Sequence, residues 1–138
     1  MNIFFEEHRE ILKALLQHRV SFILIGGYAV NYYGYHRSTG DMDIWLKPDN
    51  ANKELLVQAL ESLGFDEEGL ATISHWDFTQ TQKFHIGSEQ EPDKTEFVTH
   101  ISGVKFDLAD ELKIMADIEG LNLPIIHINT LIENKKAS

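Results

Sequence analysis

The stretch from Phe22 to Leu46, FILIGGYAVNYYGYHRSTGDMDIWL, constrains the fold more than any other part of the chain. Its apolar beginning predicts a buried strand that ends at Gly26 and Gly27. Its end predicts a second, half-buried strand that carries Asp41 and Asp43. Because residues i and i+2 of a strand point to the same face, the two carboxylates are expected to lie side by side.

This combination of glycines and aspartates favours chemistry on a metal-bound nucleoside triphosphate. Two adjacent negative charges destabilise each other unless a cation or a shared proton lies between them. Glycines where a strand meets a helix offer backbone N–H groups and a helix dipole that suit phosphate. Either motif alone is unspecific, because tight turns also use glycine and Asp-x-Asp also occurs in calcium loops and sugar-nucleotide transferases. The chain has neither a GxxxxGK[ST] loop nor a GxGxxG motif.

Length and composition indicate one domain in a reducing compartment. With 138 residues, the chain is long enough for a single hydrophobic core. It contains no cysteine, which excludes disulfides and thiolate zinc sites. The N-terminal MNIFFEEHRE lacks the features of a secretory signal, and no apolar run is long enough to span a membrane. We therefore expect a cytoplasmic protein without membrane contact.

The net charge of −10 is unevenly distributed. Residues 1–40 contain four Lys or Arg and three acidic residues, whereas residues 41–138 contain eight and nineteen. Affinity for nucleic acid comes mostly from neutralised phosphates, so this chain is expected to be a poor general binder of nucleic acid. If RNA is a substrate, the basic surface has to be local or supplied by a partner or a missing segment.

Helical and strand patterns alternate along the chain and predict an α/β or α+β domain. The pattern is weak over residues 66–93, apart from a short strand at 84–86. Residues 130–133, TLIE, form a capping box that predicts the start of a helix, and we expect its C-terminal continuation to be missing. The other predicted elements are helices over 3–19, 28–33 and 48–63 and strands over 20–25, 42–46, 95–101, 113–118 and 125–128.

The Gly-Gly, Arg-Ser-Thr and Asp-x-Asp segments together resemble the nucleotidyltransferase superfamily, whose catalytic fold is shared with DNA polymerase beta. The later segment LNLPIIHINTLIENKKAS resembles small uncharacterised bacterial nucleotidyltransferase-like proteins, in which the final helix continues further. The likeness covers most of the chain and is most specific over residues 24–46. It implies that residues 1–138 form one nucleotidyltransferase-like domain, a mixed β-sheet flanked by helices, without that helical continuation.

The resemblance also implies a site, residue by residue. Backbone N–H groups of Gly26 and Gly27 would contact the β- and γ-phosphates of the nucleotide. Asp41 and Asp43 would bind Mg²⁺, with Mn²⁺ as an alternative. Glu96 would be the third catalytic and metal-binding carboxylate, although most relatives have aspartate at this position.

Four more residues are candidates with open alternatives. Asp107 is the second choice for the third carboxylate. Arg37, Thr39 and Lys135 would bind the nucleotide by resemblance to the family. The alternatives are an ion pair for Arg37, a turn position for Thr39 and a solvated helix end for Lys135.

The aromatic residues near the glycines have two interpretations. They could stack on a nucleobase, but an aromatic cluster beside a core strand more often serves packing. The residues concerned are Tyr28, Tyr32, Tyr33, Tyr35 and Trp45.

We therefore predict a Mg²⁺-dependent nucleotidyltransferase that moves a nucleoside monophosphate from a nucleoside triphosphate, such as ATP, to an unidentified acceptor hydroxyl on RNA, protein or a small molecule. One alternative is a catalytically weak nucleotide-binding or toxin–antitoxin-type interaction module. Another is a sugar-nucleotide transferase, which leaves Gly26 and Gly27 unexplained. A domain of this size leaves its cleft open on one side, and a second domain, the missing C-terminal segment or a dimer partner would have to close it. A homodimer is therefore one hypothesis, which light scattering tests.

Overall fold

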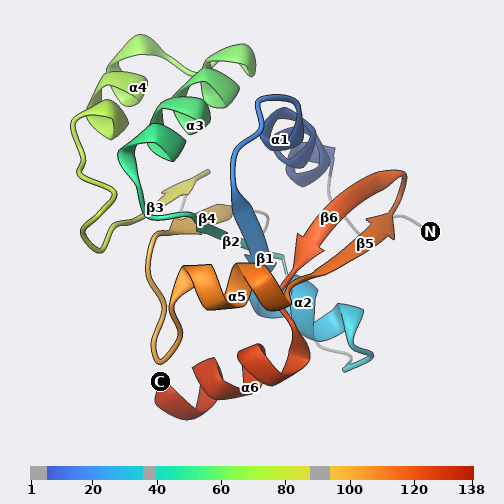
Figure 1. Ribbon diagram of the computed structural model, residues 1–138. Helices are drawn as coiled ribbons and strands as arrows, with labels where there is room; N and C mark the ends of the chain where they lie inside the picture. Colours follow the sequence, from blue (N-terminus) through green and yellow to red (C-terminus); the bar gives the residue numbers. More distant parts are fainter. Residues whose placement is uncertain (1–5, 36–39, 88–93) are drawn as a thin grey trace.

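The computed structural model describes residues 6–35, 40–87 and 94–138, and these form one mixed α/β domain (Figure 1). The predicted fold class is therefore confirmed. The described helices are α1 (Glu6–Gln17), α2 (Gly26–Tyr32), α3 (Asn50–Ser62), α4 (Glu67–Ser74), α5 (Phe106–Leu112) and α6 (Ile128–Ala137). The described strands are β1 (Phe22–Ile25), β2 (Met42–Leu46), β3 (Lys83–Ile86), β4 (Thr95–Val98), β5 (Ile114–Ile118) and β6 (Leu121–Ile125).

The strands form a single sheet in the order β3-β4-β2-β1-β6-β5. The central pair, β1 and β2, is antiparallel, and the connection between them contains α2. β4 runs parallel to β2, and β6 runs parallel to β1. At the two edges of the sheet, β3 pairs antiparallel with β4, and β5 pairs antiparallel with β6. The end of β1 and the start of β2 therefore lie next to each other in the middle of the sheet.

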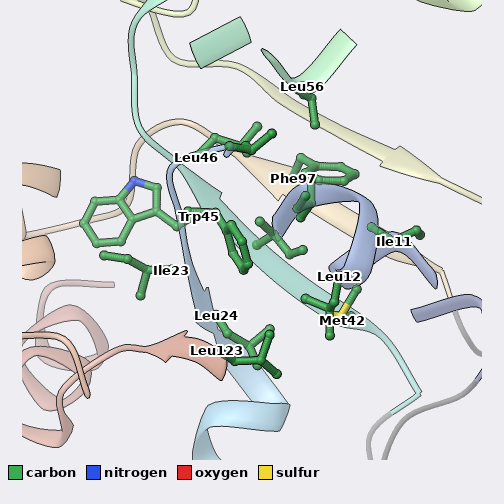
Figure 2. Close-up of a cluster of buried hydrophobic side chains, with 14 of the residues drawn as sticks. Ile11, Leu12, Ile23, Leu24, Met42, Trp45, Leu46, Leu56, Phe97 and Leu123 are labelled. Carbon is green, nitrogen blue, oxygen red and sulfur yellow. The ribbon is translucent and has the colours of Figure 1, made fainter. Parts of the chain in front are cut away.

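One face of the sheet carries the main hydrophobic core, under α1 and α3. Leu12 of α1, Leu56 of α3 and Met42 of β2 are fully buried members of one cluster (Figure 2). Aliphatic positions at helical spacing in α1 and at alternating spacing in β2 explain why these elements meet. Their burial fixes which face of β2 points away from the core.

The opposite face of β2 is covered further along the strand by α5. Trp45 is 1% exposed, and its indole Nε1 donates a hydrogen bond to the Thr99 carbonyl oxygen at 3.0 Å. Its ring meets Phe106 of α5 edge to face, with 5.2 Å between centroids. The prediction of a half-buried strand is therefore wrong for this part of β2. The short helix α5 was not predicted, because seven residues are too few to show a clear helical period.

The boundaries of two late elements also differ from the prediction. β6 begins at Leu121 rather than Ile125, because Glu119 and Gly120 have φ values of 52° and 82° and form a tight hairpin turn after β5. α6 begins at Ile128 rather than at the Thr130 capping box. Nδ1 of His127 accepts a hydrogen bond from the backbone N–H of Asn129 at 3.0 Å and caps the helix instead.

Helix α4 was not predicted either, since the sequence pattern is weak in that region. It has a regular start, where Asp66 accepts a hydrogen bond from the backbone N–H of Gly69 at 2.8 Å. Leu70 is the one buried residue of this helix, which packs on α3. Within the described residues, no helix has the length and apolar character needed to cross a membrane.

Asn52 joins α3 to the chain segments that flank the central strands. Its Oδ1 accepts a hydrogen bond from the backbone N–H of Ser21 at 2.8 Å. Its Nδ2 donates to the carbonyl oxygens of Ser21 at 2.9 Å and Lys47 at 3.2 Å. The side chain is buried, so its loss would leave backbone groups without partners.

We expect Asn52→Ala to lower the free energy of unfolding by about 1–3 kcal/mol, because buried donors and acceptors lose their partners. Urea denaturation measures this loss. Gln58→Ala, at an exposed position of the same helix, is the matched control and should stay within about 0.5 kcal/mol of the wild type. Equal losses in the two variants would contradict the role of Asn52.

Candidate active site

The candidate site begins where β1 passes into α2. Gly26 has a φ of +69°, and the N-cap residue Ile25 supplies no side-chain hydrogen bond. A Cβ atom at Gly26 would overlap the Asp43 carboxylate oxygen and would lie 2.8 Å from Cγ of Asp43. The position therefore requires glycine for two reasons, which are its backbone conformation and the close approach of Asp43. Gly27 follows as a buried residue in the first turn of α2.

Strand register brings Asp43 and Glu96 together. Asp43 is opposite Ile25 in the β1–β2 pair and opposite Glu96 in the β2–β4 pair. The carboxyl groups of Asp43 and Glu96 lie within hydrogen-bonding reach of each other. The structure thus places Glu96 beside the Asp-x-Asp motif. Asp107, the second choice, lies in the first turn of α5 and lines a different cavity, together with Trp45 and His100.

The charge of Asp43 is disfavoured by its surroundings. Burial, the negative charge of Glu96, the hydrogen bond with Glu96 and the negative charge of Asp41 together raise the pKa of Asp43 from 3.8 to about 6. The positive charge of Lys135 acts in the opposite direction and lowers the pKa. These effects place Asp41, Glu96 and Lys135 within electrostatic reach of Asp43. A proton shared between the carboxylates, or a cation, would relieve the repulsion.

Lys83 is a residue near the site that the sequence analysis missed. Its Nζ lies 3.4 Å from Oε1 of Glu96. Residue His85, two positions later on β3, is directly opposite Glu96 in the β3–β4 pair. Only an assignment of β3 as the neighbour of β4 could have pointed to Lys83, and the sequence pattern does not specify that neighbour.

The donors of the site suit a hard divalent cation. Carboxylate oxygens are the ligands that Mg²⁺ prefers, and Mg²⁺ often takes one or two of them, together with water and substrate phosphates. Among the described residues, no three His, Asp or Glu side chains converge as a complete metal-binding cluster. Further oxygen ligands would therefore have to come from a substrate or from water. The predicted nucleotide contacts Arg37 and Thr39 lie outside the described residues.

Comparison with known proteins shows the fold. No protein-family model matches the chain, and no curated protein matches it. A crystal structure from Thermotoga maritima, provisionally described as a nucleotidyltransferase, is similar with a TM-score of 0.61 and 13% sequence identity. The similarity covers 98% of this chain and 86% of the other. The likeness agrees with the fold that the nucleotidyltransferase resemblance implies, and function has to be argued from the site.

The close approach at Gly26 leads to a prediction about stability. Gly26→Ala is expected to cost more free energy of unfolding than Gly64→Ala, by about 1 kcal/mol or more. Both glycines have positive φ, but a Cβ at Gly64 would have no atom within 4 Å, whereas one at Gly26 meets Asp43. Urea denaturation of both variants gives the difference. Equal costs would mean that Asp43 moves aside freely.

The raised pKa of Asp43 leads to a prediction about pH. Between pH 4 and pH 6, the folded protein keeps a proton that Asp43 has lost in the unfolded chain, so this stabilisation disappears as the pH rises through about 6. Asp43→Asn removes the effect, so its stability relative to the wild type should increase over that range. Urea denaturation without metal, repeated from pH 4 to pH 7.5, measures the trend. A constant difference would contradict the raised pKa.

Proposed function

We propose that this protein is a nucleotidyltransferase that moves a nucleoside monophosphate from a nucleoside triphosphate to an acceptor hydroxyl on RNA, protein or a small molecule. The observation that carries the proposal is the packing of the Gly26 backbone against the side chain of Asp43, which is paired with Glu96 on the neighbouring strand. The turn at Gly26, which could bind phosphate through its backbone, is thus in contact with Asp43. A cation would relieve the repulsion between the carboxylates of Asp43 and Glu96. The fold of the Thermotoga maritima protein supports the same class.

Asp41, Asp43 and Glu96, which do not converge as a three-residue cluster in the described structure, would have to close around Mg²⁺, with Mn²⁺ as an alternative. The fit rests on the pairing of Asp43 with Glu96 on neighbouring strands, because a cation would relieve the repulsion between their carboxylates. When bound, the metal neutralises phosphate charge and lowers the pKa of the acceptor hydroxyl. The substrate phosphates would supply the further oxygen ligands.

The residues of the chain have separate proposed roles in the transfer. Backbone N–H groups of Gly26 and Gly27 face the phosphates, and the ammonium group of Lys135 neutralises their charge. The acceptor oxygen bonds to the α-phosphorus while the bond to pyrophosphate breaks, and Glu96 receives the hydroxyl proton. Arg37 and Thr39 remain proposed contacts to the nucleotide.

A second candidate is a module that binds nucleotide with little transfer activity. The observation that favours it is the ion pair between Glu96 and Lys83, because this pair engages the carboxylate proposed to receive the proton. Nucleotide binding would then serve an interaction with another protein, as in a toxin–antitoxin pair. The two candidates differ in whether pyrophosphate is released.

The binding part of the proposal is tested by thermal unfolding with each of the four nucleoside triphosphates and Mg²⁺. A nucleotide present at about 100 times its Kd should stabilise the wild type by about 2.7 kcal/mol. Asp43→Asn should abolish most of this gain, since it removes a proposed metal ligand. Asp107→Asn, the matched control on α5, should keep it. If no triphosphate stabilises the wild type, the proposed function is wrong.

The transfer part is tested by following pyrophosphate release with the stabilising nucleotide. Candidate RNA, protein and small-molecule acceptors with free hydroxyl groups are supplied in turn. Release that depends on both an acceptor and Asp43 supports the nucleotidyltransferase. Stable nucleotide binding without release favours the second candidate.

A further inference from the structure

Helices α2 and α6 both contribute residues to one cavity near the candidate site. At the site end, Gly26 begins α2 against Asp43, and the charge of Lys135, late in α6, acts on Asp43. At the other end, the hydroxyl of Tyr33 donates a hydrogen bond to the Ile126 carbonyl oxygen at 2.6 Å, shortly before α6 begins. Lys135 of α6 is therefore within electrostatic reach of Asp43, and the C-cap of α2 is hydrogen-bonded to the segment before α6.

A cavity of about 360 Å³ lies between these two helices. This volume is within the range of small-molecule pockets, about 300–1,000 Å³. Most of the lining is apolar or aromatic, and two lysines contribute the positive charge. The residues used below are Val30, Tyr33 and Tyr35 on the α2 side and Ile132, Lys135 and Lys136 on α6.

Helical spacing connects this cavity to the phosphate end of the site. Gly26, Val30 and Tyr33 have the spacing i, i+4 and i+7, so they follow one face along α2 and its C-cap. The rise of the helix puts about 10 Å between the first and the last of them. Lys135 contributes to the lining of the cavity and also acts on Asp43. A ligand could therefore reach from the carboxylates into the cavity.

The lining chemistry suits a flat aromatic group with anionic groups attached at one end. Tyr35 is 65% exposed and Ile132 is 45% exposed, so the walls present apolar surface that the chain itself leaves uncovered. Aromatic side chains stack on nucleobases without needing a particular base. Lys135 and Lys136 supply positive charge, as a polyphosphate requires.

We propose that the cavity between α2 and α6 holds the nucleobase of the triphosphate whose phosphates lie at Gly26 and Asp43. This inference rests on the proposed function and adds the position of the base. It assigns the α2–α6 cavity, rather than the one near Asp107, to the substrate. Stacking on the tyrosine-lined wall would supply affinity beyond that of the phosphates, and tolerance among bases follows from it.

The test compares Mg²⁺-bound nucleoside triphosphates with Mg²⁺-bound inorganic tripolyphosphate, which lacks base and sugar. Ile132→Trp fills the cavity without changing charge, and Ile132 is exposed enough to tolerate the substitution. Leu108→Trp is the matched control, since Leu108 is 54% exposed on α5 and does not line the cavity. Isothermal titration calorimetry gives Kd for both ligands with the wild type and both variants.

We expect Ile132→Trp to weaken nucleotide binding roughly tenfold or more, while tripolyphosphate binding stays within about twofold of the wild type. Leu108→Trp should bind both ligands as the wild type does. Nucleotide binding that survives Ile132→Trp, or that is no tighter than tripolyphosphate binding in the wild type, would overturn the position of the base alone. If the wild type binds neither ligand, the proposed function fails, and this inference fails with it.

Discussion

The pairing of β2 between β1 and β4 is the constraint on which the candidate site depends. Antiparallel pairing with β1 places Asp43 beside the start of α2, and parallel pairing with β4 places Glu96 on its other side. These two registers are fixed by buried side chains, because a shift by one residue would turn the apolar set of β2 towards the wrong face. Fully buried Met42 and Ile44 therefore hold the position of the intervening Asp43.

That rigid frame also explains why the site is electrostatically unfavourable by itself. The strands hold Asp43 and Glu96 in contact, and burial raises the cost of charge at Asp43. Gly26 closes one side of the carboxylate so tightly that a methyl group would not fit. The positive charge of Lys135, on α6, partly offsets the negative charge at Asp43 and lowers its pKa. Such repulsion between buried carboxylates is expected where a protein binds a cation or a polyphosphate.

Much of the candidate site could be predicted from the sequence because its central features are local. The paired glycines mark the end of the preceding strand, and the spacing of Asp41 and Asp43 predicts one strand face, although β2 begins at Met42 and Asp41 lies just before it. The choice of Glu96 came from resemblance, and strand register now places it beside Asp43. Boundaries of β6 and α6 were missed, since a hairpin turn and a histidine cap decided them.

Hydrophobic periodicity and glycine placement act over a few residues, so the order of amino acids is enough to predict the fold class, the two central strands and the spacing of Asp41 and Asp43. The neighbours of the carboxylates at the site depend instead on long-range packing. Lys83 reaches Glu96 from an edge strand, and the cavity lined by Tyr33 and Ile132 exists only where α2 and α6 meet. Such contacts join segments far apart in the chain, and they depend on which faces pack together, which no local pattern records.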